Sequence, residues 1–395
     1  MGSGIHARLS LVALLVTAGV ARVVASCAES APPADGALDA GDTGDTAESG
    51  TVLPPPADSC GAGTWCRVEL PFTAVSLNGI WGSGPEDVWV AGNPHITIHW
   101  DGKRFVRTTV DTRKALFGIW GSGKGDIWAF STSQTMWHSQ GFDGDDAGWS
   151  RSSETTGLNH KDGGLHDDRP VPILAMWGTS ASDVWAVGAS MFSYYGSEEV
   201  PSVFHCDGWR DGEPNWQPSD TSFADAGSPE QVSFNAIHGN ASSGVWIVGN
   251  GGKTRYSTGW NGDRTAWTPV NSNTSRNLNA VWCSPDADVW AAGEGATMQR
   301  FTRADGGEYA ALTVDVPTTA VLRALWGFAA DDVWAVGDAG TILHWDGKAW
   351  SADGSIQGLT EDLFAIWGSS KDDIWIAGRG VLLHKGSASL PREIK

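Results

Sequence analysis

The chain has 395 residues and contains 23 Trp against 12 Phe and 4 Tyr, with 51 Gly and only 18% charged residues. So few charges exclude a long coiled coil, and 41% hydrophobic residues suffice for a packed core. The formal net charge of -20 argues against nucleic-acid binding, because that affinity depends on Lys and Arg neutralising phosphates. The excess of Trp indicates that a Trp-containing unit repeats along the chain.

The N-terminal residues have the features of an export signal. An apolar run, residues 9–21, has the length of a signal-peptide core and is short for a transmembrane helix. Residues 24–27, Val-Ala-Ser-Cys, resemble a bacterial lipobox, which implies a lipoprotein signal peptide over 1–26 and lipidation of Cys27. Ala28, in place of Asp, implies the outer membrane or cell surface of a Gram-negative bacterium. A periplasmic or secreted protein is the alternative.

The composition changes sharply after the signal. Residues 27–58 contain seven acidic residues and no Lys or Arg, and they end near three consecutive prolines. Such a segment cannot bury enough apolar surface to fold, so it is predicted to be an acidic disordered tether. The folded domain is expected over residues 59–390.

A short motif occurs seven times in that domain, for example as L-N-G-I-W-G from Leu77 and as L-F-A-I-W-G from Leu363. A second Trp follows eight residues after the first, usually within Asp-Val/Ile-Trp. The pairs are Trp81/Trp89, Trp120/Trp128, Trp177/Trp185, His238/Trp246, Trp282/Trp290, Trp326/Trp334 and Trp367/Trp375. They begin 39, 57, 61, 44, 44 and 41 residues apart, a period typical of repeat architectures.

Each repeat reads as four antiparallel strands. The first strand is apolar on both faces, as expected between two sheets, and a polar turn separates it from the Asp-Val-Trp strand. A third strand, such as 341–345, leads through Asp346-Gly347, a tight hairpin signal, to a fourth strand near Trp350. Four-stranded units at this period predict an all-β, seven-bladed β-propeller.

The two ends of the repeat region complement each other. The seventh repeat stops after its third strand, and residues 64–70 form an orphan strand ahead of the first repeat. Pairing the two would close the ring and remove its open edge. Cys60 and Cys66 flank the closing strand and are a candidate disulfide in an exported protein, with two unpaired thiols as the alternative. Cys206 and Cys283 are expected to be buried free thiols.

The repeat resembles those of YVTN/BNR-like and WD-repeat seven-bladed propellers. Its W-G-S-x-x-x-D-V-W-A-V-G consensus is most similar to repeats in predicted surface lipoproteins of myxobacteria and related deltaproteobacteria. The resemblance covers about residues 60–386 and implies the fold, because unrelated functions share propellers.

The sequence contains no recognisable catalytic motif or metal-spaced Cys pair, and neither a metal nor another cofactor is expected. The Asp before each second Trp recurs too regularly for a catalytic role, and we expect its carboxylate to accept hydrogen bonds from turn amides. The Trp side chains are expected to pack between blades. BNR repeats also occur in sialidases, but neither an arginine triad nor a Tyr/Glu nucleophile pair can be assigned here.

Three insertions interrupt the period, at about 150–172, 189–201 and 218–232. If the first strand of each blade is innermost, all three lie on one face of the propeller, where recognition residues are often found. The candidate ligand-binding residues are Phe192, Tyr194, Tyr195, Glu198, His160, His166 and Asp167. The His160, His166 and Asp167 spacing matches no standard metal site. Functionless decoration is the alternative.

The sequence therefore predicts a non-enzymatic, envelope-tethered propeller. It would be anchored to the membrane by its lipid and would bind an envelope protein or glycan as a monomer. A sialidase-like glycoside hydrolase or lyase and a purely structural scaffold are the alternatives.

Overall fold

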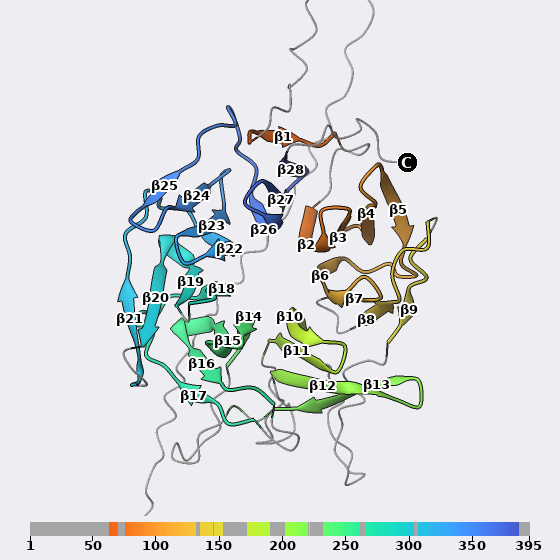
Figure 1. Ribbon diagram of the computed structural model, residues 1–395, viewed down its shortest axis with the longest axis horizontal. Helices are drawn as coiled ribbons and strands as arrows, with labels where there is room; N and C mark the ends of the chain where they lie inside the picture. Colours follow the sequence, from red (N-terminus) through yellow and green to blue (C-terminus); the bar gives the residue numbers. More distant parts are fainter. Residues whose placement is uncertain are drawn as a thin grey trace, which may run out of the picture. The chain divides into compact units, whose positions relative to one another are not determined.

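The computed structural model describes residues 63–69, 76–131, 135–144, 146–152, 172–189, 202–219, 221, 232–260, 265–286, 288–303 and 307–386. All of them belong to one compact unit, Pro55–Lys395. They form seven four-stranded antiparallel sheets arranged as blades around a central axis (Figure 1). The predicted seven-bladed β-propeller is therefore confirmed. Within the described part of the chain, no helix is long and apolar enough to cross a membrane.

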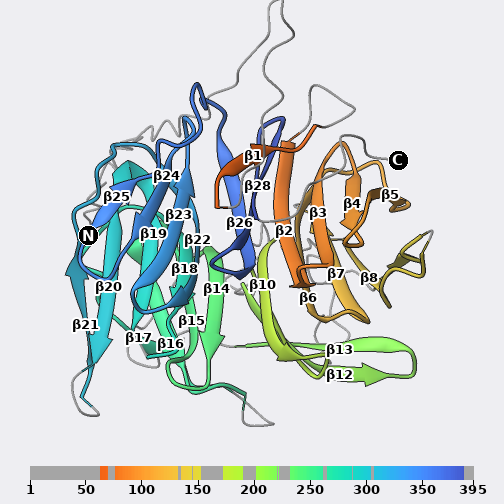
Figure 2. The ribbon, with the colours of Figure 1, turned by 45° about the horizontal axis from the view of Figure 1, so that its top comes forward.

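The blades share one strand order, with the first strand innermost (Figures 1 and 2). The first strands are β2 (Ser76–Gly84), β6 (Leu116–Gly123), β10 (Ile173–Ser180), β14 (Phe234–Asn240), β18 (Leu278–Cys283), β22 (Leu322–Ala329) and β26 (Leu363–Ser370). The second strands are β3 (Asp87–Asn93), β7 (Asp126–Ser131), β11 (Asp183–Gly188), β15 (Gly244–Gly249), β19 (Val289–Gly293), β23 (Asp332–Gly337) and β27 (Asp373–Gly378).

The outer strands are shorter and more variable. The third strands are β4 (Ile96–Trp100), β8 (Met136–Ser139), β12 (Val203–Arg210), β16 (Thr254–Ser257), β20 (Met298–Arg303), β24 (Ile342–Trp345) and β28 (Val381–Lys385). The fourth strands are β5 (Phe105–Thr109), β9 (Ser150–Arg151), β13 (Glu213–Pro218), β17 (Thr268–Pro269), β21 (Tyr309–Thr313), β25 (Trp350–Ala352) and β1 (Trp65–Arg67). Two short 3₁₀ segments, η2 (Asn250–Gly252) and η3 (Glu294–Ala296), follow β15 and β19.

The ring closes as predicted, through β1 from the N-terminal side. β1 pairs antiparallel with β28, so it completes the seventh blade and covers its outer edge. The Arg67 guanidinium donates two hydrogen bonds to the Glu361 carboxylate, of 2.7 and 3.2 Å, and Trp65 Nε1 donates to Asp353 at 2.9 Å. Cys66 is disulfide-bonded. Cys60 lies outside the described residues, so their pairing stays a prediction.

The second Trp of each repeat is the hydrophobic centre of a blade interface. Trp290 of the fifth blade contacts Trp345 and Trp350 of the sixth, with ring centroids 5.1 and 5.4 Å apart. Trp375 of the seventh blade contacts Phe105 of the first at 5.8 Å. These second Trp side chains are almost completely buried, as expected for large aromatic groups between packed sheets.

The first Trp explains the glycine that follows it in the repeat. A Cβ on Gly121 would lie 2.7 Å from the Trp81 indole of the preceding blade, and a Cβ on Gly327 equally close to Trp282. Trp367 and Trp177 contact Gly82 and Gly239 in the same way, so at these four interfaces the indole rests on glycine backbone in the next blade. Between the fourth and fifth blades, His238 replaces the Trp and Cys283 replaces the Gly. The Cys283 amide donates to His238 Nδ1 at 3.0 Å.

The recurrent Asp is structural, but its partners differ from those expected. Asp87 accepts hydrogen bonds from Ser83 Oγ at 2.5 Å, Trp89 Nε1 at 3.0 Å and His99 Nε2 at 2.7 Å. Side chains from the first three strands, rather than turn amides, thus converge on the carboxylate. The same Asp–His bond occurs at Asp126–His138, Asp183–His205, Asp332–His344 and Asp373–His384.

Two blades lack the histidine. In the fifth blade Arg300 takes its place and pairs with Asp288. In the fourth blade the Asp position is Gly244, and Trp246 Nε1 donates instead to the Ser243 carbonyl at 2.9 Å. Cys206 and Cys283 are buried free thiols, as the sequence predicted. Burial raises the pKa of the Cys206 thiol to about 11 and that of Cys283 to about 12.

Candidate functional site

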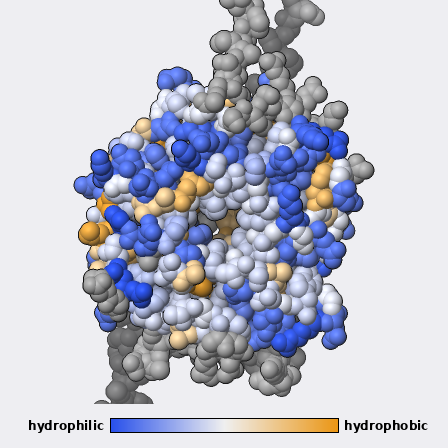
Figure 3. Space-filling view, viewed as in Figure 1, coloured by the Kyte–Doolittle hydropathy of each residue, from blue (hydrophilic) through white to orange (hydrophobic). Residues whose placement is uncertain are grey.

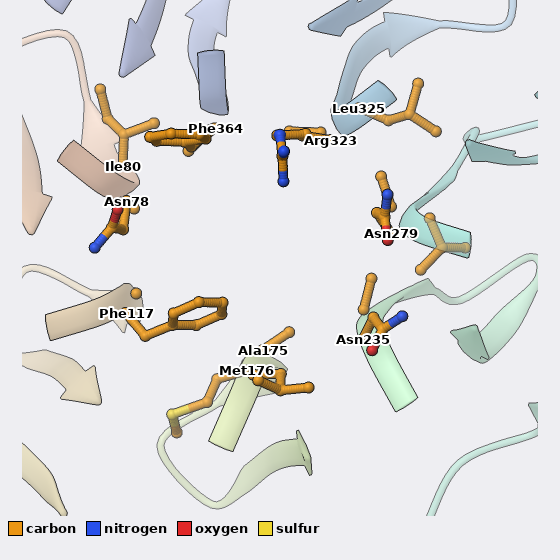
Figure 4. Close-up of a pocket in the computed structure, with 18 of the residues that line it drawn as sticks. Asn78, Ile80, Phe117, Ala175, Met176, Asn235, Asn279, Arg323, Leu325 and Phe364 are labelled. Carbon is orange, nitrogen blue, oxygen red and sulfur yellow. The ribbon is translucent and has the colours of Figure 1, made fainter. Parts of the chain in front are cut away.

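The first strands enclose a cavity of about 610 Å³ at the propeller axis. The surface is hollowed there (Figure 3), and side chains from all seven blades point into the hollow (Figure 4). The residue after the first Leu, Ile or Phe of each motif forms its outermost layer. This layer, hereafter the axial ring, consists of Asn78, Phe117, Leu174, Asn235, Asn279, Arg323 and Phe364.

The cavity is layered because the motif alternates residue sizes. Behind the axial ring, every blade contributes a Gly or Ala, such as Gly79 and Ala365. The next layer is aliphatic and includes Ile80, Met176 and Leu325. The small residues allow close packing beside the cavity, because a Cβ on Gly79 would lie 2.7 Å from the Gly118 backbone of the next blade. The cavity thus combines a polar and aromatic mouth with an apolar interior.

The three asparagines of the axial ring join neighbouring blades. Asn78 Nδ2 donates to the Leu116 carbonyl at 2.7 Å, and Asn235 Nδ2 donates to the Leu278 carbonyl at 2.9 Å. Asn279 Nδ2 makes the same bond to the Leu322 carbonyl at 3.1 Å. Each amide satisfies the first carbonyl of the next inner strand, which stiffens the mouth of the cavity.

A charged and aromatic cluster lies at the sixth and seventh blades. The Arg323 and Arg379 guanidinium groups lie 5.5 and 5.7 Å from the centre of the Phe364 ring, within cation–π range. Arg323 pairs with Asp338, and Arg379 pairs with Asp362 at 2.9 Å. The pKa of Asp362 is lowered, first by the hydrogen bond from the Ala339 amide and then by Arg379. The cluster therefore presents ordered guanidinium groups beside an aromatic ring.

Phe117 adds a second aromatic side chain to the mouth. It is 40% exposed, one of three large hydrophobic residues so exposed within the described ranges, together with Trp209 and Leu312. Its side chain extends toward the axis from β6 (Figure 4). An exposed aromatic group in a cavity mouth is a feature of binding sites rather than of a core.

Strand polarity places the axial ring on the face to which the three insertions connect. The first strands begin at this face and the second strands end there, so Pro172, Ala189 and Val232 mark where the described chain meets the insertions. The predicted ligand-binding residues lie outside the described residues, and their role stays a prediction. They are His160, His166, Asp167, Phe192, Tyr194, Tyr195 and Glu198.

The described lining of the cavity is poor in ionisable groups. Arg323 is its sole ionisable lining residue among those described, so the arginine triad of a sialidase is not assembled from them. No group of three or more His, Cys, Asp or Glu residues in the described ranges is placed to hold a metal ion.

Sequence reasoning missed the axial ring. Its position in the motif varies among Asn, Phe, Leu and Arg, while the positions beside it are nearly constant. Such variation at one fixed position of a repeat is the signal that could have located it.

Comparison with known proteins supports the fold assignment. The sequence profile of the family described as photosynthesis system II assembly factor YCF48 (PSII_BNR) matches residues 251–385, about a third of the chain. The chain has the fold of a BNR-like β-propeller. A search of curated proteins gave no match.

Solved structures show the same architecture at low sequence identity. YCF48 from Cyanidioschyzon merolae is 18% identical with a TM-score of 0.60, over 82% of this chain and 99% of that one. A structure titled "YCF48 bound to D1 peptide" is 18% identical with a TM-score of 0.59, over 82% and 97%. Virginiamycin B lyase from Staphylococcus aureus is 15% identical with a TM-score of 0.58, over 81% and 98%.

Proposed function

We propose that this protein is a non-enzymatic binding module whose axial cavity takes an extended segment of a partner protein. The observation that carries the proposal is the axial ring, which brings the exposed Phe117 to the same cavity mouth as Phe364 and Arg323. Arg379 packs against Phe364 beside this mouth. Aromatic side chains and arginine dominate binding energy at protein interfaces, and the apolar layer behind them could receive one side chain.

The rigidity of the mouth favours the same function. The asparagine bonds between blades and the Asp338 and Asp362 ion pairs hold the ring residues in place before a partner arrives. Preorganised groups lose little conformational entropy on binding. The similar propeller solved with a peptide shows that such a fold accommodates one in that protein.

Membrane tethering completes the proposal. Lipidation of Cys27 would hold the propeller at the envelope, and the acidic segment 27–58 would separate it from the membrane. Metabolic labelling with a fatty acid tests this point. The wild-type chain should be labelled and Cys27→Ser should not, and labelling of the variant would contradict the lipid anchor.

Peptide selection tests the binding site. A random-peptide phage library selected on the full chain should enrich sequences that bind the wild type. Phe117→Ala combined with Phe364→Ala should weaken these peptides at least tenfold, since hot-spot aromatic side chains contribute about 2 kcal/mol or more each. Leu312→Ala is the matched control, because Leu312 is 55% exposed on the outer strand β21, away from the axis.

Two outcomes would reject the axial site. Peptides that bind the double variant as tightly as the wild type must sit elsewhere on the molecule. Failure to enrich any peptide dependent on Phe117 or Phe364 would favour the structural-scaffold alternative.

A further inference from the structure

A second cavity lies between the second and third blades, away from the axis. It has a volume of about 1060 Å³ and is bordered by the β8–β9 connection and the β12–β13 hairpin. That hairpin reaches outward from the propeller (Figures 1 and 2). Its described lining includes Gln140, Phe142, Asp143, Ser150 and Trp209, and we call this cavity the Trp209 groove.

Trp209 reaches the groove because the third blade departs from the repeat. In the sixth blade, Trp345 on the third strand covers the second-strand Trp290 of the preceding blade. The equivalent position in the third blade is Cys206, whose side chain is much smaller. Trp209 stacks on Trp128 instead, with ring centroids 5.7 Å apart and an interplanar angle of 30°.

This arrangement fixes the indole while leaving much of it in solvent. Trp209 also lies 4.6 Å from the His138 ring, yet it remains 40% exposed. The longer hairpin is held by the Arg210–Asp207 ion pair at 3.1 Å and by a hydrogen bond from Asn215 to Asp207. A Trp that only filled space in the core would be buried, whereas Trp209 is held in place with much of its indole exposed.

The opposite wall is equally ordered and carries polar groups. Arg104 Nη2 donates to the Gly144 carbonyl at 2.9 Å, and the Asp146 amide donates to Asp143 Oδ1 at 2.9 Å. Gln140, Asp143 and Ser150 are exposed along this wall. A Cβ on Gly148 or Gly212 would meet nothing within 4 Å, so a ligand can approach the backbone closely at these two glycines.

The charges and the apolar side chains of the lining indicate which class of ligand the Trp209 groove can bind. The described lining has two carboxylates, Asp126 and Asp143, and no Lys or Arg, which disfavours phosphates and other anions. Its only aliphatic side chains are those of Ala147 and Ala181, which disfavours a lipid tail. A pyranose ring fits both limits: its C–H face can stack on an indole, and its hydroxyls can bond amide and carboxylate oxygens.

We propose that the Trp209 groove binds a pyranose unit of an uncharged polysaccharide, with Trp209 as the stacking platform and Gln140 and Asp143 as hydrogen-bonding groups. The site is independent of the axial cavity. The protein would then hold a glycan at its side and a protein segment at its axis.

Affinity electrophoresis of the full chain tests the proposal. Native gels would contain amylose, soluble β-glucan, glucomannan or glycol chitin, each an uncharged polymer of pyranose units. At least one polymer should retard the wild type, and Trp209→Ala should weaken that retardation tenfold or more. Trp209→Phe should retain part of it because an aromatic face remains. Leu312→Ala and the Phe117→Ala, Phe364→Ala variant should migrate like the wild type.

A second variant keeps the test decisive if Trp209→Ala fails to fold. Gln140→Ala leaves the stack on Trp128 intact, and it should weaken retardation several-fold with unchanged thermal unfolding. Wild-type migration unaffected by all four polymers would overturn the proposal, as would retardation equal in Trp209→Ala and wild type.

Discussion

Replacing Asp87 by Ala tests whether the recurrent Asp holds a blade together. The carboxylate joins the Ser83 hydroxyl, the Trp89 indole and the His99 imidazole. Its pKa is lowered: burial opposes the shift, but the hydrogen bonds from His99 and Ser83 outweigh burial. An ionised carboxylate only accepts hydrogen bonds, so the His99 Nε2 that faces it carries a proton.

The expected loss of stability follows from what the variant leaves behind. Ser83 is exposed and can bond water instead. Trp89 and His99 are 0% and 3% exposed, so their donors would lose their partner inside the blade. An unsatisfied buried group costs about 1–3 kcal/mol, and removing the carboxylate also removes its own desolvation cost. We therefore expect Asp87→Ala to lower the free energy of unfolding by about 2–4 kcal/mol.

Urea unfolding followed by circular dichroism measures this difference, with Glu86→Ala as the matched control. Glu86 is the exposed neighbour of Asp87 and has the same charge. Because the pKa of Asp87 is lowered in the fold, its contribution is present above pH 3.8 and is lost as the pH falls further. An Asp87→Ala variant within about 0.5 kcal/mol of Glu86→Ala at pH 7 would refute the reasoning.

Two further predictions concern blade contacts. His238→Trp should lower the free energy of unfolding by about 1–3 kcal/mol through overpacking against Cys283, and adding Cys283→Gly should restore it, as urea midpoints would show. Desolvation lowers the pKa of His238 to about 4. The free energy of unfolding of the wild type should therefore fall as the pH falls from about 6.5 to 4, because the imidazole is protonated first in the unfolded chain. The His238→Trp, Cys283→Gly variant should lack this pH dependence. Arg67 lowers the pKa of Glu361 to about 2, so the stability of Glu361→Gln should approach that of the wild type as the pH falls from 4.5 toward 2. A difference in the free energy of unfolding between the two that stays constant over this pH range would contradict the closing ion pair.

The residues of the axial cavity could not be predicted from the sequence, because they are distant from one another along the chain. Cavity-lining positions such as Phe117 and Arg323 sit in different repeats, 206 residues apart in sequence, and only ring closure brings them to one mouth. Nothing local in either repeat marks them as partners. Trp209 likewise looked like one of many Trp residues, and its exposure depends on the small side chain at Cys206 and on the neighbouring blade.

The sequence by itself determined the number of blades, their strand order and the closing strand. These properties follow from the alternation of residue types along each strand and from a motif that recurs seven times, so each repeat gives the same evidence independently. Only the tertiary structure decided the partners of the recurrent Asp, the composition of the axial ring and the exposure of Trp209. These depend on contacts between blades and between strands of one blade, where a side chain's neighbour is set by packing rather than by sequence distance. The Trp excess thus identified the fold, whereas the proposed binding sites depend on positions that differ from blade to blade.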